Sequence, residues 1–568
     1  MNEPRTFERT VVTQMQQDET TIWTNDNVGE VVPGVVTPLS WSLLEPLSNG
    51  AFRYFLRQMG VRHYPQAGLF GLFYGRVYLN LTRFQALLRR FYPSEVGVGL
   101  SSWQRLGAAF TLLKTAVRAV WLLLTLPGQA KRYIAEVLGQ RRARGDHGRA
   151  SADLLADVAR WQEVCQRGMN VHLAITIFAN LLYELLDKLV QRWRGDAHVT
   201  AAELVTGLPG MRSAEVGRAL RSLARRAAAI PEARQILLNS PPEEVLPRLR
   251  ACPATESLLA DLEAFLAEHG HASQQEFELM APRWRDDPTP VLSMLRGHVR
   301  AADSADAEDQ AAVRQWATRT IRSRLVGGLE RLIPLRWAFL ALLLRWTQEY
   351  SVLRENMKYT FVLAYGQLRE NYLTLARHLV ESGRLDAADD IFFLRAEEVT
   401  RLVSGGLEAS AVRDLIARRR RERECHLATD APPTIEEHGE ERSGERCQQR
   451  APQAERPTDG VLQGLAASPG RVTARARVML DPSDAAVLQK GEVLVAPATN
   501  PAWSPLFLTA GALVTEIGGL LSHGAIVARE YGLPAVLNVK DATRVIRTGQ
   551  LLTVDGWQGT IYIENDSG

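Results

Sequence analysis

The sequence predicts a multidomain protein in which a large, mostly α-helical domain precedes a small α/β domain. From about residue 47 to residue 428, apolar residues recur every three or four positions, the period of an amphipathic helix. From residue 458 on, short β-rich runs alternate with glycine, aspartate and proline turns. Residues 429–457 contain Pro432, Pro433 and several glutamates but almost no large apolar residue, so they are expected to form a linker.

Composition narrows the class of protein. The chain has 568 residues, enough for two to four domains, and a net charge of +3, too small to indicate a nucleic-acid or membrane partner. Its four cysteines are scattered and show neither metal-ligand spacing nor a disulfide framework. Residues 1–21 are too polar for a secretory signal, and the apolar runs 119–126 and 337–344 are too short to span a bilayer. We therefore expect a cytoplasmic protein without a metal site.

Taken in order, residues 1–26 are expected to be a short tail, and Pro33-Gly34 and Pro38 make residues 22–47 extended. The helical domain is expected to cover residues 27–428, where the run of arginines at 418–421 is more typical of a solvated helix face than of a nucleic-acid patch. The α/β domain is expected to cover residues 458–568, with strands near 476–480, 493–496, 512–515 and 551–554.

One histidine in the α/β domain has a special setting. A strand ending near Glu516, a glycine pair and a short helix beginning near Ser522 place His523 in the first turn of that helix. Free backbone N–H groups and the positive end of the helix dipole favour an anion there and keep the imidazole neutral. A phosphate group would then be bound by Gly519, Ser522 and Gly524. The imidazole of His523 would be the nucleophile that attacks its phosphorus. Taken alone, the pattern also fits a capping or surface histidine.

The wider sequence resembles the phosphorylation-site signature of the phosphoenolpyruvate-utilising enzymes, whose mobile domain carries a phosphohistidine. The resemblance runs from Gly464 to about Gly559 and includes Ser468-Pro469-Gly470, Leu494-Val495-Ala496, Pro501-Ala502-Trp503 and Asp555-Gly556. It implies that residues 458–568 form a swivelling phosphohistidine domain and that His523 is the phosphoryl carrier.

The helical domain resembles the substrate domain of rifampin phosphotransferases and related dikinases, at residues 27–42, 75–81, 270–284 and 389–394. His271 and Glu276 would supply a general base there or bind a cation, although a polar helix end also explains them. Related enzymes commonly read Gly-His-Arg-Gly where this chain has Gly-His-Ala-Ser at 270–273. Arg76 and Arg354 would hold a phosphate or an acidic substrate, or else form structural ion pairs.

Rifampin phosphotransferases and phosphoenolpyruvate synthases begin with an ATP-grasp domain, which needs at least ~200 residues. Only 26 residues precede Asn27 here, and no Walker-type loop is present. The resemblance therefore implies a phosphotransferase subunit that is charged in trans by a separate ATP-grasp protein, which binds the ATP and Mg²⁺, and that phosphorylates a small organic acceptor. Two alternatives remain: a non-catalytic ligand-binding or regulatory protein, favoured by Ala272-Ser273, and a ligase-like biosynthetic enzyme that uses the phosphohistidine.

Overall fold

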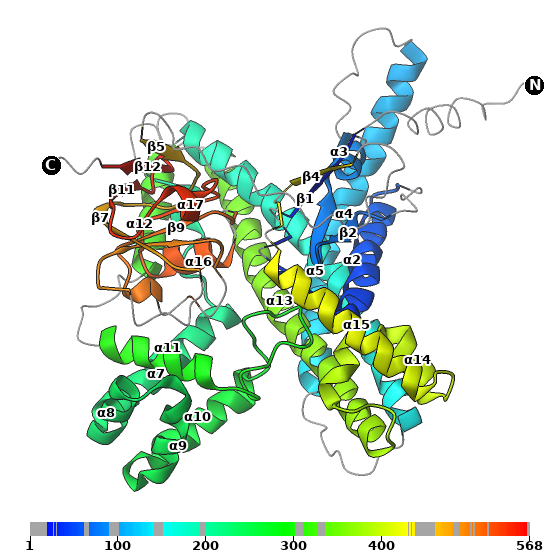
Figure 1. The fold of residues 1–568 in the computed structure, drawn as a ribbon. Coiled ribbons are helices and arrows are strands. Elements are labelled where there is room, and N and C mark those ends of the chain that lie inside the picture. Colours follow the sequence, from blue (N-terminus) through cyan, green and yellow to red (C-terminus); the bar gives the residue numbers. More distant parts are fainter. Residues whose placement is uncertain are drawn as a thin grey trace, which may run out of the picture. The chain divides into compact units, whose positions relative to one another are not determined.

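The chain forms two compact units (Figure 1): Met1–Leu124 with Leu373–Gln453, and Thr125–Tyr372 with Ala454–Gly568. The computed structural model describes residues 20–25, 28–29, 31–61, 68–89, 102–140, 151–193, 199–301, 310–325, 335–429, 431–432, 434–437, 460–480, 488–499, 503, 506–519 and 522–564. Two long helices, α4 (Ser102–Gln140) and α13 (Leu335–Glu381), begin in one unit and end in the other.

The first unit contains a four-stranded antiparallel sheet in the order β2-β3-β1-β4. Its strands are β1 (Thr21–Thr24), β2 (Phe70–Phe73), β3 (Arg76–Asn80) and β4 (Thr434–Glu437). The β2–β3 turn is formed by Tyr74 and Gly75, both at positive φ, as in the tight turns that suit hairpins. β1 lies within the expected tail and β4 within the expected linker. The hairpin corrects the expectation of helix at residues 70–80.

The helices of this unit pack against the sheet and against one another. They are α2 (Pro38–Gln58), α3 (Leu81–Arg89), η4 (Ala388–Phe393), α14 (Ala396–Val403) and α15 (Ala409–Ala428). α2 begins nine residues before the expected helical start, because Thr37 caps it and Pro38 suits a first helical position. In the arginine run, Arg419 pairs with Glu398 and Arg420 with Asp390. These two arginines therefore join α15 to α14 and η4.

The helical part of the second unit contains a small bundle around one apolar core. The elements of this helical part are α5 (Ser151–Trp193), α6 (Ala201–Leu204), α7 (Arg212–Ala229), α8 (Pro231–Asn239), α9 (Pro242–Ala251), η2 (Pro253–Thr255), α10 (Glu256–His269), α11 (Thr289–Ala301) and α12 (Gln310–Leu325). Helices α7 to α11 share a core of buried leucines, valines and alanines. Among the described residues, no helix is long and apolar enough to cross a bilayer.

The α/β domain of the second unit is built on an eight-stranded sheet in the order β5-β12-β11-β7-β8-β9-β10-β6. Its elements are β5 (Val461–Gln463), β6 (Leu465–Ser468), β7 (Arg471–Val478), β8 (Val493–Ala496), η7 (Leu506–Leu508), β9 (Ala512–Thr515), α16 (His523–Glu530), β10 (Ala535–Leu537), α17 (Ala542–Val545), β11 (Leu551–Asp555) and β12 (Thr560–Ile563). Strands β7, β8, β9 and β10 run parallel.

Alternate residues of the central strands face two separate cores. Val493 and Val495 of β8 belong to the core that includes α17, whereas Leu494 and Ala496 belong to the core that includes Ala525 of α16. The two helices therefore cover opposite faces of the sheet, as the period-two alternation of side chains requires. The predicted fold class, a large helical domain followed by a small α/β domain, is confirmed.

Candidate functional site

The turn from β9 into α16 has the predicted form. β9 ends at Thr515, Gly518 and Gly519 follow, and α16 begins at His523. Ser522 has an extended backbone (φ −65°, ψ 163°), and its hydroxyl accepts a hydrogen bond of 3.2 Å from the Ala525 N–H. This cap leaves other N–H groups of the first turn without a carbonyl partner inside the helix. An anion beside position 523 would therefore meet both these donors and the positive end of the helix dipole.

A threonine from another strand also reaches this turn. Thr499 is buried and follows β8, and its hydroxyl lies against Gly524 so closely that a Cβ there would overlap it. β8 and β9 are parallel, so their carboxyl ends open onto the same edge of the sheet, where ligands of α/β sheets commonly bind. Sequence reasoning missed Thr499, because it lies 24 positions before His523 and only this strand pairing brings the two segments together.

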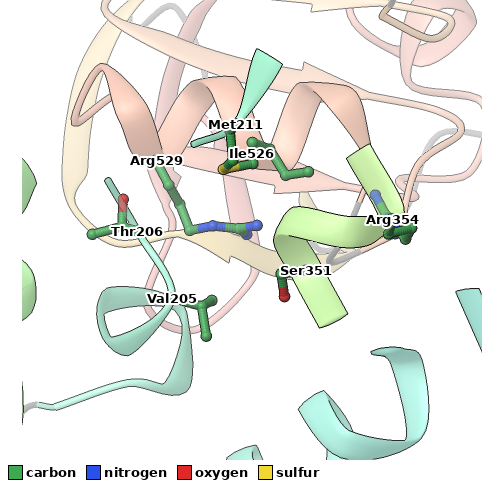
Figure 2. Close-up of a pocket in the computed structure, with 7 residues that line it drawn as sticks. All are labelled: Val205, Thr206, Met211, Ser351, Arg354, Ile526 and Arg529. Atoms are coloured by element: carbon green, nitrogen blue, oxygen red, sulfur yellow. The ribbon is translucent and has the colours of Figure 1, made fainter. Parts of the chain in front are cut away.

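A pocket in the second unit is lined by α16 and by helical segments (Figure 2). Its lining residues are Val205, Thr206, Met211, Ser351, Arg354, Ile526 and Arg529. Figure 2 shows the Arg529 guanidinium lying between α16 and the segment of α13 that carries Ser351. Position 523 lies three residues before Ile526, so the two share a face of α16. The pocket therefore lies on the same side of α16 as position 523.

A second contact joins this domain to α7. Arg221 donates a hydrogen bond of 3.0 Å to the Tyr531 hydroxyl, and its guanidinium carbon lies 5.5 Å from the centre of that ring. Gly217, one turn earlier on α7, leaves room for the phenol, since a Cβ there would lie 3.6 Å from its oxygen. Tyr531 is the residue that follows the last residue of α16. α16 is thus contacted by α7 at its carboxyl end.

The face of α13 beyond the pocket carries charged side chains. Arg354 pairs with Glu355 at 2.9 Å, and Lys358, one turn further along, pairs with the predicted residue Glu276 at 2.9 Å. Burial, followed by the charges of Arg354 and Lys358, lowers the pKa of His172 on α5 to about 4. This histidine is therefore neutral at pH 7. Sequence reasoning missed Lys358, although its spacing of four residues from Arg354 on a helix was a usable signal.

The other predicted residues have different surroundings. His271 is buried, and its ring meets the Tyr359 ring edge-on at a centroid distance of 4.6 Å. Arg76 belongs to the first unit, where it donates to the carbonyl oxygens of Tyr74 and His426. Among the described residues, no cluster of histidine, cysteine and carboxylate side chains could hold a metal ion.

The fold and this site define a class of protein: a helical domain joined to an α/β domain with a histidine at the start of a helix, as in phosphohistidine domains. Residues 488–559 match the family described as the PEP-utilising enzyme mobile domain, and residues 171–355 match the rifampicin phosphotransferase fourth domain. The chain belongs to this family of rifampicin phosphotransferases and PEP-utilising enzymes.

Three curated relatives illustrate the similarity. The prodigiosin synthesizing transferase PigC of Serratia marcescens is 28% identical over 95% of this chain and 62% of its own length. A rifampicin phosphotransferase of Streptomyces sviceus is 30% identical over 67% of this chain and 42% of its own length. Chondramide synthase cmdD of Chondromyces crocatus is 32% identical over 69% of this chain and 10% of its own length. The chain thus spans less than two thirds of each of these relatives.

Proposed function

We propose that this chain is a phosphotransferase subunit in which His523 accepts a phosphoryl group and passes it to a small organic acceptor bound by the helical domain. One observation carries the proposal. α16, which begins at His523, contributes Ile526 and Arg529 to a pocket whose other side includes Ser351 and Arg354 of α13. A carrier at position 523 therefore lies near the helical domain that would bind the acceptor.

The proposed chemistry has two balanced steps. A neutral imidazole nitrogen of His523 attacks the phosphorus, forming an N–P bond as the P–O bond to the donor breaks. The acceptor hydroxyl oxygen then attacks the same phosphorus, the N–P bond breaks, and the imidazole is regenerated. The Arg354 guanidinium would neutralise the phosphoryl oxygens, and Glu276, positioned by Lys358, would take the hydroxyl proton.

The proposed donor is ATP bound with Mg²⁺ on a separate ATP-grasp protein. The sheets of the described residues are the four-stranded sheet of the first unit and the eight-stranded sheet of the α/β domain. We assign both sheets to other roles and propose that ATP and Mg²⁺ are bound by a partner. The proposed location is the cytoplasm, where ATP is available to such a partner.

Labelling tests this function directly. The chain is incubated with a purified ATP-grasp protein, Mg²⁺ and ATP labelled at the β-phosphate, and an acid-labile label is expected on the wild type. His523→Ala should carry none, whereas the control His378→Ala, a substitution on α13, should be labelled like the wild type. If the wild type stays unlabelled where the mobile domain of a rifampicin phosphotransferase is labelled, the chain is a non-catalytic ligand-binding or regulatory protein.

The similarity to biosynthetic relatives favours a second candidate function, that of a ligase-like enzyme. The match to the prodigiosin synthesizing transferase covers 95% of this chain, against 67% for the rifampicin phosphotransferase, and a chondramide synthase also matches. A ligase-like enzyme would use the phosphohistidine to activate one substrate, and a second substrate would then displace the phosphate. Product analysis separates the two candidates, because a phosphotransferase leaves a stable phosphate ester, whereas a ligase releases inorganic phosphate with a condensed product.

A further inference from the structure

Arg283 is a buried cation in the segment that joins α10 to α11. It is 1% exposed, and among the described residues its three guanidinium nitrogens have no hydrogen-bond partner. Arg369 on α13 is also buried, but two of its nitrogens are hydrogen-bonded: they donate to the Leu279 carbonyl oxygen and the Asp286 carboxylate, each at 2.7 Å. The same region of the fold therefore holds one paired and one unpaired arginine.

Within the described part of the chain, a second buried hydrogen-bond donor without a partner is the hydroxyl of Tyr365, which acts electrostatically on Arg283. The Tyr365 hydroxyl is fully buried and also has no hydrogen-bond partner among the described residues. Tyr365 lies one turn before Arg369 on α13. Burial, and then the charge of Arg369, lowers the pKa of Arg283 to about 10, while Tyr365, Glu276 and Glu278 act in the opposite direction. Arg283 therefore keeps its charge at neutral pH.

The segment that carries Arg283 is unusual in its length. Residues 270–288 join α10 to α11 without a helix or a strand, although Phe277, Leu279 and Trp284 within it are buried. Most connections in compact domains are shorter, and irregular segments of this length commonly serve binding. Arg283 is buried, so a ligand would reach its guanidinium only when part of this segment moves.

The chemistry of the unused groups selects the ligand. A buried guanidinium without an acceptor is strongly unfavourable, and nearly all buried polar groups in proteins are paired. Arginine presents its N–H donors in a planar fork and has no acceptor, and a phenol can add one more donor. Donors of these two kinds suit the oxygens of an oxyanion.

We propose that Arg283 and Tyr365 form a binding subsite of the helical domain for the oxyanion of a ligand, a carboxylate or a phosphate group. Tyr365 lies eleven residues beyond Arg354 on α13, which corresponds to about 16 Å of helix. Tyr365 therefore lies beyond the part of α13 that lines the pocket beside α16, and binding at the subsite does not require the phosphoryl carrier.

The test compares the full-length wild type with Arg283→Met, whose side chain keeps much of the arginine length without its charge. Melting temperatures are measured in sodium phosphate, in sodium acetate and in sodium chloride at equal ionic strength. One or both oxyanions should raise the melting temperature of the wild type by about 2 °C or more relative to chloride. That difference should vanish in Arg283→Met and persist in Arg285→Met, a control in which a half-buried arginine of the same segment is removed. A larger shift in phosphate identifies a phosphate group, and a larger shift in acetate a carboxylate.

The ligand-free proteins give an independent readout. Removing an unpaired buried charge should leave the melting temperature in chloride equal to or above that of the wild type, whereas Arg369→Met should lower it. If Arg283→Met lowers it as much as Arg369→Met does, Arg283 is a structural residue paired through water, and the proposal is wrong. Equal oxyanion shifts in the wild type and in Arg283→Met, or none in either, also overturn it. His523→Ala should keep the shift, so this result is separable from the phosphotransferase test.

Discussion

Gly524→Ala is expected to destabilise the α/β domain, although alanine is normally the better helix former. In a helix interior, alanine is favoured over glycine by up to about 1 kcal/mol. Here the new methyl group would overlap the Thr499 hydroxyl and lie 3.7 Å from a methyl group of Leu513. Thr499 is only 6% exposed, so its hydroxyl cannot move into solvent. Overpacking of this kind costs about 1–3 kcal/mol, which exceeds the gain in helix propensity.

Denaturant unfolding of the full chain measures this effect, and phosphate labelling measures its consequence for the carrier. We expect Gly524→Ala to unfold at lower denaturant and to accept less label, because the backbone on either side of position 524 must shift. Thr499→Ala in the same chain removes the overlapping hydroxyl, so the double variant should regain stability relative to Gly524→Ala. If Gly524→Ala alone is as stable as the wild type, the close contact between α16 and Thr499 is not a real constraint.

Three further outcomes follow from local contacts. Ser522→Ala removes the cap on the Ala525 N–H and should cost about 1 kcal/mol in unfolding experiments, with Ser522→Thr as the conservative control. Burial and two neighbouring cations lower the pKa of His172 to about 4, so only the unfolded chain binds this proton as the pH falls from about 6.5 to 4. The wild type should lose stability across that window, and His172→Gln should lose less; equal slopes would contradict the assignment. Burial alone would raise the pKa of Glu492, but hydrogen bonds from Arg477 and a backbone N–H hold it below its usual value. Glu492→Gln should therefore be less stable than the wild type at pH 7, and urea unfolding should show the gap closing as the pH falls below about 4.5.

Local patterns were sufficient to predict the α/β domain. Its strands follow short runs of β-branched residues between turns, and the glycine pair before Ser522 marks the start of α16. Gly532, predicted as the residue just beyond this helix, has a φ of 63°, which glycine adopts without strain. In these segments the conformation depends on neighbours in sequence, so the sequence alone was informative.

Contacts between distant segments could not be predicted in the same way. The pairing of Trp23 with Ile435 joins residues more than 400 positions apart, and neither segment is long enough to show a clear period. The burial of Arg283 is equally hidden, because the surrounding Ala-Pro-Arg-Trp sequence resembles an exposed turn. Among the predicted site residues, Ser522 and Gly524 lie together at the start of α16, and Arg354 lines the nearby pocket. Their roles in phosphoryl transfer stay predictions.

The position of β1 inside its sheet has a practical consequence for shortened versions of this protein. β1 separates β3 from β4, and Trp23 donates a hydrogen bond to Glu437 across the β1–β4 pair. A chain that starts after Thr24 would leave β4 without a neighbour in this sheet and would expose the edge of β3. Removing the first two dozen residues would therefore release β4, a segment more than 400 positions downstream. It would also leave an unpaired strand edge that favours aggregation, so shortened versions of the protein should keep these residues.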